Sequence, residues 1–554
     1  MEQHGRNSFF VVGEGVIEFD RDGNALTRRP AAVEELRRFR FSRMGPEGAQ
    51  LDEGTRVALA HAMTAAGAQP ESSDPPVPAG FTYLGQFVDH DLTMDRTGAR
   101  LGEDVTLDEL VQGRSPALDL DSVYGRGPDD HADRVFYAAD RVKLKVGTTS
   151  PASDPSGDGQ VTLPAMEGFD LPRFGQSGLT EEERRRPLIP DPRNDENLAV
   201  AQTHLAFIRF HNQVVDELAL RGLTGRRLFE AARGQVVRHY QWVLRHDFLP
   251  RVVDPAIVDD VFANGRRFFE APRRGRPVGP HPTMPLEFAV AAYRLGHSMI
   301  RSSYEWNRLF NTGTGIPGTL FLLFAFSGTS GNFDGGSSLA DLDDPHHESV
   351  DALPTSWIAD FRRLYDFTEV DRPDLAPPAG GGNAAMRVDS LLVDPLDQLP
   401  AGTFSGRGTV VEDVQRNLAF RNLTRAGMVR LATGQQMAEF LGVEPLTEEQ
   451  VLVGHGGASL DSLTEEQRAA VAAATPLWFY VLREAEFHGG RLGPVGGRIV
   501  AEVFHRAMEG SRTSIVREPS WRPAFGPDRR TFRMTDLLLF AFEGKADLLN
   551  PLGD

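Results

Sequence analysis

One short apolar segment, residues 85–92, carries a glutamine, a histidine and two carboxylates within six residues. If the segment is helical, Gln86 and His90 lie one turn apart on the same face, so both side chains could contact one small ligand. Asp89 and Asp91 would then point in other directions. Titratable groups in apolar surroundings must either be solvated or bind something. The segment is a candidate ligand site, although by itself it fits a helix end with a capping aspartate and a surface histidine equally well.

A second candidate pair directly precedes a long stretch of helical periodicity. Arg193 and Glu196 are three residues apart, so at the start of a helix both can point into a neighbouring cavity. The alternative is a capping cluster, in which Asp195 and Glu196 stabilise the first helical turn electrostatically. That alternative explains the acids but not the arginine before them.

A histidine beside a glycine marks a third apolar segment. Gly296 leaves room for a flat ligand to approach the imidazole of His297. Arg294 and Arg301 lie about one turn to either side of this histidine and suit paired anionic groups. Because an isolated core histidine is usually a hydrogen-bonded structural residue, this segment gains meaning only together with the others.

A fourth segment places an amide and a guanidinium on one helical face. Asn422 and Arg425 are three residues apart. The amide oxygen of Asn422 could accept the second ring N–H of a metal-ligating histidine, which would fix the tautomer and raise the basicity of that histidine. Without such a partner, the pair is an ordinary polar helix face.

A fifth segment offers alternating oxygen donors. The side chains of Ser115, Asp119 and Asp121, with a backbone carbonyl near Ala117, suit a hard cation such as calcium, and Asp91 could complete the site. The spacing is not that of an EF-hand loop, because the required glycine and final glutamate are absent. A turn rich in capping acids explains the loop about as well.

Helices would position most of these side chains. The apolar periodicity is strongest at 198–220 and 229–249, whereas strand patterns are sparse. Further helices are predicted at 34–41, 55–66, 286–301, 411–432, 435–441, 465–474, 476–485 and 496–508. Segments rich in proline, glycine and serine predict long surface loops. We therefore expect a mainly α fold with one large helical core, long loops and little β-structure, in which residues 1–77 are an N-terminal arm and residues 78–554 one domain.

Composition excludes several classes of protein. The 554 residues are 40% hydrophobic and 25% charged, and the formal net charge of −19 argues against a nucleic-acid partner. The absence of cysteine excludes disulfides, thiolate nucleophiles and thiolate-held metals. The sequence shows neither a recognisable signal peptide nor an apolar run long enough to span a membrane. We expect a cytoplasmic location in preference to secretion without a recognisable signal.

Four of these segments, in this order and at these separations, resemble the animal heme peroxidase (peroxidase–cyclooxygenase) superfamily, in a bacterial version. They read Gly-Gln-Phe-Val-Asp-His-Asp at 85–91, Arg-x-x-Glu at 193–196, Tyr-Arg-Leu-Gly-His at 293–297 and Asn-Leu-Thr-Arg at 422–425. Each motif alone is weak, but four in order form a specific signal. The resemblance runs from about residue 81 to residue 508 and implies the helical heme peroxidase fold over residues 78–554.

The resemblance implies heme b as cofactor, bound between a catalytic distal face and a proximal iron ligand. The implied residues are Gln86, His90 and Arg193 on the distal face, His297 as iron ligand, Asn422 as its hydrogen-bond partner, and Arg294 and Arg425 at the heme propionates.

The resemblance also implies covalent heme attachment and a calcium ion. Two carboxylates form heme esters in some members of the superfamily, and Asp89 and Glu196 occupy those positions. Asn197 stands where one member has a methionine linked to heme, so that third link should be absent. The implied calcium ligands are Asp91, Ser115, Ala117 (carbonyl), Asp119 and Asp121. Serine at 115 and aspartate at 121 depart from the usual threonine and serine, but both keep an oxygen donor.

The implied activity is a heme peroxidase that reduces hydrogen peroxide and oxidises a small organic or halide donor through a high-valent iron intermediate. His90 would act as general base and then general acid, and Arg193 would stabilise the departing oxygen. A fatty-acid dioxygenase of the same superfamily is an alternative, but its radical tyrosine would stand at Arg294, whereas Tyr293 lies one residue out of register, about 100° around a helix. A non-catalytic, calcium-stabilised interaction protein is the other alternative. The expected partners are hydrogen peroxide and a small reductant, and the oligomeric state stays open.

Overall fold

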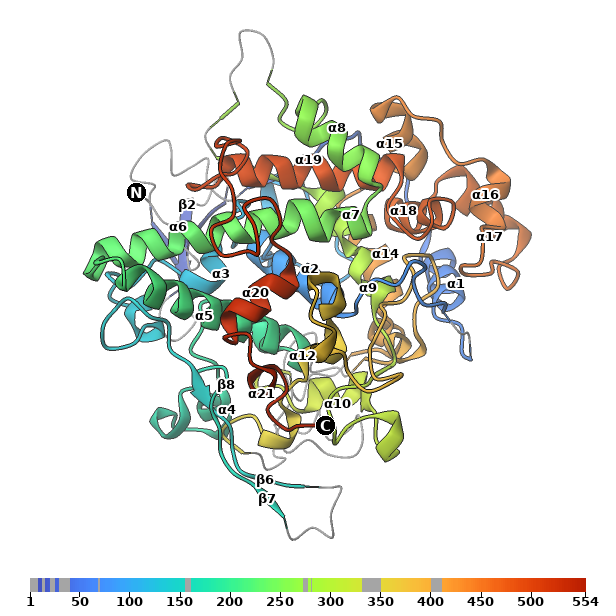
Figure 1. Ribbon diagram of the computed structural model, residues 1–554. Helices are drawn as coiled ribbons and strands as arrows, with labels where there is room; N and C mark the ends of the chain where they lie inside the picture. Colours follow the sequence, from blue (N-terminus) through green and yellow to red (C-terminus); the bar gives the residue numbers. More distant parts are fainter. Residues whose placement is uncertain are drawn as a thin grey trace.

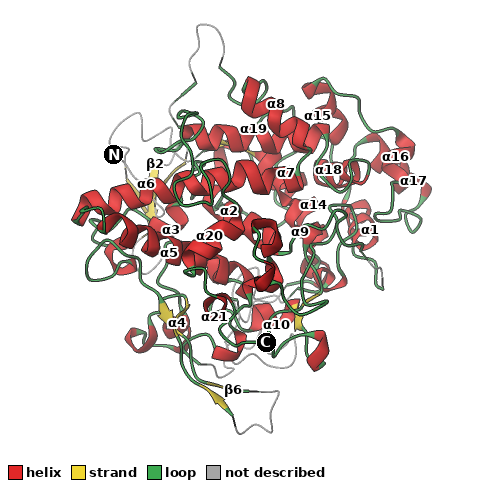
Figure 2. Cartoon of the chain, in the orientation of Figure 1, coloured by secondary structure: helices red, strands yellow, loops and turns green. Residues whose placement is uncertain are grey.

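A computed structural model of the chain describes residues 8–11, 15–19, 25–28, 40–67, 70–154, 161–272, 278–279, 281–330, 350–399 and 411–554. Helices dominate these ranges, and the strands form small peripheral sheets (Figure 2). The predicted mainly α fold with little β-structure is confirmed. None of the helices in the described ranges is both long and apolar enough to cross a bilayer.

The helices are α1 Glu53–Met63, α2 Gly80–Leu92, α3 Asp121–Tyr124, α4 Glu181–Arg185, α5 Leu198–Ala219, α6 Gly225–Val243, α7 Leu249–Val252, α8 Pro255–Asn264, α9 Gly296–Met299, α10 Leu320–Ala325, α12 Phe361–Leu364, α14 Leu418–Met428, α15 Gly434–Leu441, α16 Glu448–Leu452, α17 Glu465–Ala473, α18 Leu477–Glu486, α19 Pro494–Gly510, α20 Met534–Ala541 and α21 Ala546–Leu549.

The strands are β1 Ser8–Val11, β2 Gly15–Phe19, β3 Ala25–Arg28, β4 Phe41–Ser42, β5 Gly147–Thr148, β6 Ala152–Ser153, β7 Thr162–Leu163, β8 Glu167–Asp170, β9 Met284–Pro285, β10 Ser303–Tyr304 and β11 Gly318–Thr319. Strands β1, β2 and β3 form an antiparallel sheet in that order. The pairs β5–β8, β6–β7 and β10–β11 are antiparallel, and β4–β9 is parallel.

Helix α2 lies near the middle of the molecule in Figure 1, with α5 and α6 to its left and α9 and α14 to its right. Its apolar residues recur every three or four positions and form one buried face that packs on α5. Phe87 stacks on Phe207 of α5, with ring centroids 4.7 Å apart, and meets Tyr240 of α6 edge-on. This burial orients the opposite, polar face of α2.

The start of α5 is set by two caps. Asp191 accepts the backbone N–H of Arg193 and begins a 3₁₀ turn over Pro192–Asp195. Asn197 then accepts the backbone N–H of Val200 at 3.0 Å and begins the α-helix. Because α5 and this turn both pack on α2, the turn presents its side chains to the polar face of α2.

The prediction of one regular helix at 286–301 is wrong. The segment is a π-helix over Glu287–Ala291, a 3₁₀ turn over Ala292–Leu295 and then α9. Glu287 is buried and its carboxylate accepts the backbone N–H groups of Met44 and Gly45 at 2.9 and 3.0 Å, so a distant part of the chain fixes the start of this segment.

This distortion overturns one expectation about Arg301. The helix ends before this residue, whose guanidinium donates to the carbonyls of Ser303 and Ala384 at 3.2 and 2.8 Å. Arg301 therefore holds local backbone and does not share a helical face with His297.

Helix boundaries elsewhere follow the periodicity closely, as α5, α15, α17, α18 and α19 show. The predicted helix at 229–249 begins earlier and passes through a π turn at Leu244–Phe248 into α7, and that at 411–432 becomes a 3₁₀ turn at Asp413–Arg416 followed by α14. The predicted helix at 34–41 lies mostly outside the described residues, and Phe41 itself begins β4.

Candidate active site

A histidine of α2 is held by an asparagine of the 3₁₀ turn that precedes α5. His90 is buried, and its Nδ1 lies 2.8 Å from Oδ1 of Asn194, whose Nδ2 lies 2.9 Å from Nδ1 of His204. Burial lowers the pKa of His204 to about 3, so this ring stays neutral and can accept the amide N–H. Since the amide oxygen of Asn194 can only accept, the neutral form of His90 carries its hydrogen on Nδ1 and its lone pair on Nε2.

That Nε2 atom faces a carboxylate. Oε1 of Glu196 lies 3.5 Å from Nε2 of His90 and also accepts the side-chain amide of Gln86. Asn197 donates to Oε1 of Gln86 at 2.9 Å and so orients that amide. Gln86 and His90, predicted to face one ligand, therefore both face Glu196. The side chain of Glu196 is 28% exposed, so the group borders open space.

Arg193 lies against the C-terminal end of α2. Its guanidinium donates through Nε and Nη2 to Asp191 at 3.1 and 2.8 Å, and through Nη2 to the carbonyls of His90 and Thr93 at 3.0 and 2.7 Å. Burial acts to raise the pKa of Asp191, but Arg193 and Arg114 hold it well below its usual range. Within the described residues, Nη1 of Arg193 makes no hydrogen bond, so one edge of this fixed cation is available to a ligand.

A second histidine lies at the start of α9, the helix that packs against α2. Nδ1 of His297 lies 2.9 Å from Nδ2 of Asn422, and Oδ1 of Asn422 accepts Nη1 of Arg294 at 3.2 Å. The predicted contact is present, but the amide presents its nitrogen to the imidazole, contrary to expectation, because the cationic Arg294 takes the oxygen. Release of Arg294 to an anionic partner would let the amide rotate and present its oxygen to His297.

Open space borders His297. A Cβ atom placed on Gly296 would meet no atom within 4 Å. Burial, with the charges of Arg294 and Arg425, lowers the pKa of His297 to about 3, yet this side chain remains partly accessible. A deep imidazole that is neutral and accessible can ligate a metal. The Nε2 atom of His297 makes no hydrogen bond within the part of the chain that the structure describes.

Partly buried arginines crowd the same region. Burial and the nearby Arg425 lower the pKa of Arg294 to about 10, and burial with Arg425 and Arg294 does the same for Arg421. Over the described ranges, neither Arg294 nor Arg425 forms an ion pair. Desolvated, mutually repelling cations are costly unless an anion joins them. The cluster therefore suits a ligand with two carboxylates, such as heme, and the residues present fit that group.

Asp89 of α2 and Tyr293 of the 3₁₀ turn before α9 lie near each other, and Tyr293 ties this turn to α2. Asp89 accepts Oγ1 of Thr93 at 2.9 Å and stays partly accessible. Burial, with the charge of Asp89, raises the pKa of Tyr293. The hydroxyl of Tyr293 donates to the carbonyl of Gly85 at 3.2 Å, and its ring stacks on Phe288. Tyr293 is therefore committed to packing and to a backbone contact.

Three carboxylates form a separate cluster, one from the end of α2 and two from the segment that begins α3. Asp91, Asp119 and Asp121 each offer an oxygen atom, and these atoms lie within 4.8 Å of one another. Burial, followed by the charges of Asp121 and Asp119, raises the pKa of Asp91 well above its usual range. On the same loop, Oγ of Ser115 is buried with no hydrogen-bond partner in the described residues, and the carbonyl of Ala117 accepts the Asp119 N–H at 3.0 Å. This donor set fits a hard divalent cation.

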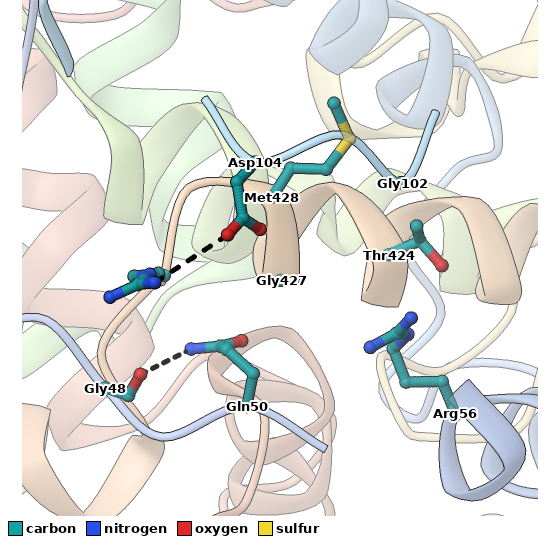
Figure 3. Close-up of a pocket in the computed structure, with 9 residues that line it drawn as sticks. Gly48, Gln50, Arg56, Gly102, Asp104, Thr424, Gly427 and Met428 are labelled. Atoms are coloured by element: carbon teal, nitrogen blue, oxygen red, sulfur yellow. Dashed lines mark hydrogen bonds and ion pairs between the residues drawn. The ribbon is translucent and has the colours of Figure 1, made fainter. Parts of the chain in front are cut away.

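A cavity of about 410 Å³ lies apart from both histidines, on the face of α14 that Thr424 and Gly427 occupy (Figure 3). The remaining lining residues are Gly48, Gln50, Arg56, Gly102, Asp104, Met428 and Arg430. Asp104 and Arg430 pair at 3.7 Å across one side of it. Thr424 is two positions from Asn422, about 200° around the helix, so this cavity opens away from His297.

Sequence reasoning missed Asn194, His204 and Asp191 as contributors to the site. Asn194 lies within the quoted 193–196 segment and Asp191 two residues before it, but only the 3₁₀ turn brings their side chains to His90 and Arg193. The residue type offered a signal for Asn194, because a buried amide between charged neighbours requires partners.

Comparison with known proteins finds similarity to peroxidases. Residues 86–319 match the model of the family described as animal haem peroxidase. A peroxidase-like protein of Margaritifera margaritifera is 34% identical over 119 residues, which cover 21% of this chain and 14% of that protein. Thyroid peroxidase of Mus musculus is 25% identical over 196 residues, 35% of this chain and 20% of that protein. The chain thus spans a minor part of the length of these relatives.

Solved structures share the fold across most of the chain. Peroxidase A from Dictyostelium discoideum superposes with a TM-score of 0.53 at 14% identity and covers 93% of this chain and 94% of its own. A fatty acid alpha-dioxygenase from Oryza sativa has a TM-score of 0.50 at 12% identity, covering 85% of this chain and 76% of its own.

Proposed function

We propose that this chain is a heme peroxidase that reduces hydrogen peroxide and oxidises a small organic or halide donor, because residues 86–319 match the model of the animal haem peroxidase family. One observation carries the proposal: two histidines on the adjoining helices α2 and α9 each have Nδ1 engaged by an asparagine. His90 contacts Asn194 and His297 contacts Asn422, at 2.8 and 2.9 Å. Each Nε2 is left for chemistry.

In this proposal the chain holds heme through two kinds of contact. His297 would provide Nε2 to the iron, and Arg294 and Arg425 would pair with the propionates, which neutralises the crowded cations described above. Release of Arg294 from Asn422 would turn the amide oxygen toward His297 and strengthen its donation. Bound heme supplies a redox-active iron that accepts the oxidising equivalents of peroxide.

One residue would transfer a proton between the oxygens of peroxide, and another would stabilise the negative charge that develops. Hydrogen peroxide must lose a proton from one oxygen and gain one on the other before the O–O bond breaks heterolytically. His90 has its lone pair on Nε2, so it can accept the first proton and return it to the departing oxygen. The available Nη1 edge of Arg193 would stabilise negative charge on that oxygen. Gln86 would help to orient peroxide through its amide.

The position of Tyr293 favours peroxidase over fatty-acid dioxygenase activity. A dioxygenase of this superfamily resembles the chain in fold, but the radical tyrosine position is Arg294 here, and Tyr293 is bound to Gly85 and stacked on Phe288. With peroxide and a phenolic donor, the heme-loaded protein should turn over. Incorporation of oxygen into a fatty acid without peroxide consumption would favour the dioxygenase instead.

We further propose calcium as the cation bound by Asp91, Asp119 and Asp121, with Ser115 and the Ala117 carbonyl as further ligands. Saturating Ca²⁺ at about 100 times its Kd should add about 2.7 kcal/mol to the free energy of unfolding. At one fixed Ca²⁺ concentration and constant ionic strength, the gain should be larger near pH 8 than near pH 5.

The sign of this pH effect follows from the raised pKa of Asp91. A carboxyl with a raised folded-state pKa binds more protons in the native than in the unfolded state, so the cation-free protein loses stability as pH rises above about 4. Calcium binds the ionised form and cancels this loss. Calorimetric melts with Ca²⁺ or chelator measure the effect, and a calcium gain that is absent or equal at both pH values would contradict it.

We also propose that Asp89 and Glu196 form esters with heme. Both carboxylates are partly accessible beside the proposed heme space, which supports attachment. After peroxide treatment, heme should stay with the wild-type chain in denaturing mass spectrometry. The variants Asp89→Asn and Glu196→Gln should each keep one link, and the double variant should release heme completely. Release of heme from the wild-type chain would reject covalent attachment.

The proposed catalytic domain spans residues 78–554 and the proposed N-terminal arm residues 1–77, with a cytoplasmic location. Helix α1 belongs to this arm and packs on α14, the helix that carries Asn422 and Arg425. The arm thus supports the proximal side of the site.

A further inference from the structure

A fully buried arginine joins the carboxylate cluster to the distal site. Arg114 is 0% exposed; its Nη1 donates to Asp121 at 3.1 Å and its Nη2 donates to Oδ2 of Asp191. Asp191, also 0% exposed, accepts Nε and Nη2 of Arg193. A continuous series of charge-assisted hydrogen bonds therefore runs from Asp121 to the guanidinium beside His90.

Three carboxylates and one arginine meet at one end of this series. Asp91, Asp119 and Asp121 together carry three negative charges when ionised, and Arg114 supplies one positive charge at the edge of the cluster. A divalent cation would make the sum zero. Buried charges require such compensation, because their interaction is poorly screened. Arg114 thus reduces the net negative charge that a bound cation would experience at this site.

At the distal end of the series, the carboxylate of Asp191 accepts hydrogen bonds from both Arg114 and Arg193. Its Oδ1 accepts hydrogen bonds from the backbone N and Nε of Arg193. Its Oδ2 accepts hydrogen bonds from Nη2 of both Arg193 and Arg114. A bound cation would repel Arg114 and compete for Asp121, which pushes Arg114 toward Asp191. Because a guanidinium is a rigid fork, such a shift is transmitted to the carboxylate that fixes Arg193.

We propose that Arg114 and Asp191 are positioning residues that couple the cation site to the distal arginine. Arg114 is the internal counter-ion of Asp121, and Asp191 transmits the occupancy of the cation site to Arg193. The distal half of this inference rests on the proposed peroxidase function, and the counter-ion half does not.

Calcium titration of the full chain by calorimetry tests the counter-ion role. Arg114→Met should tighten Ca²⁺ binding about tenfold or more, because it removes a buried positive charge next to the cation. Asp121→Asn should weaken binding by a similar factor. The double variant restores the wild-type net charge, so its affinity should return to within about threefold of wild type and its Tm should exceed that of Arg114→Met. Unchanged or weaker binding in Arg114→Met, or a double variant that binds Ca²⁺ no better than Asp121→Asn, would overturn this role.

Stopped-flow reaction of the heme-loaded protein with peroxide tests the positioning role. Asp191→Asn should lower the second-order rate constant about tenfold or more, with an unchanged heme spectrum. Removing Ca²⁺ with chelator should slow the wild type about fivefold or more but leave Asp191→Asn unchanged. An Asp191→Asn variant that reacts as fast as wild type would overturn the coupling.

A matched control separates these effects from loss of any buried ion pair. Arg483 and Glu486 of α18 are both 0% exposed and pair at 3.0 Å, and neither contacts the series of residues described above. Arg483→Met should lower Tm but leave Ca²⁺ affinity and the peroxide rate unchanged. If wild-type protein does not react with peroxide at all, the proposed function fails, while the calcium titrations still decide the role of Arg114.

Discussion

Replacing His90 with alanine slows the reaction of the heme-loaded protein with hydrogen peroxide by about 10²-fold or more, in our expectation. The reason is the fixed tautomer. Asn194 holds Nδ1 of His90 at 2.8 Å, which leaves the Nε2 lone pair as the proton acceptor for peroxide. Alanine at this position removes the base, and Glu196, whose Oε1 lies 3.5 Å from Nε2 of His90, is the proposed site of a heme ester and would not replace it.

Stopped-flow absorbance at increasing peroxide concentration measures this second-order rate constant. His211→Ala is the matched control, because His211 is also fully buried but bonds to Tyr124 and the Val142 carbonyl. The control should react at the wild-type rate per bound heme. A His90→Ala protein that reacts as fast as wild type would remove this residue from the mechanism.

Replacing His297 with alanine should abolish specific heme ligation, with an affinity loss of about 10²-fold or more, because metal affinity depends on each donor atom. The smaller change Asn422→Leu should lower heme affinity or activity about 10- to 100-fold, since it removes only the partner of Nδ1. His297 lies beside open space at Gly296 and has no other hydrogen bond in the described residues that would hold its Nε2.

Heme titration into heme-free protein, followed by absorption, gives these affinities. The His211→Ala control should bind heme as wild type does. If His297→Ala keeps the wild-type spectrum and affinity, another residue is the iron ligand. Loss of binding in the control as well would indicate a folding defect and would invalidate the comparison.

The features that sequence predicted well are local ones. Apolar periodicity and a capping asparagine define α5, and threonine caps define α15 and α17, so their boundaries lie within one or two residues of prediction. The convergence of Gln86 and His90 on one group likewise follows from their spacing on α2. Such features depend on neighbours in the chain, which the sequence displays directly.

The features that sequence could not predict depend on distant contacts. Buried Glu287 ties the start of the π-helix to residues 44 and 45, a contact across the fold that the spacing of the segment does not reveal. Arg114 looks like a loop arginine in the sequence, and only the fold buries it between Asp121 and Asp191. Arg294 sets the orientation of the Asn422 amide, because it competes with His297 for the amide oxygen. The spacing of residues within either motif does not reveal this competition.

The absorption spectrum of the purified, heme-supplied protein tests the central claim most directly. Histidine-ligated ferric heme should give a Soret band at about 400 nm. The proposed function predicts this band, its loss in the His297→Ala variant and its rapid change on addition of hydrogen peroxide. A folded, heme-supplied protein that shows no Soret band, or a band that peroxide leaves unchanged, would contradict the assignment of this chain as a heme peroxidase.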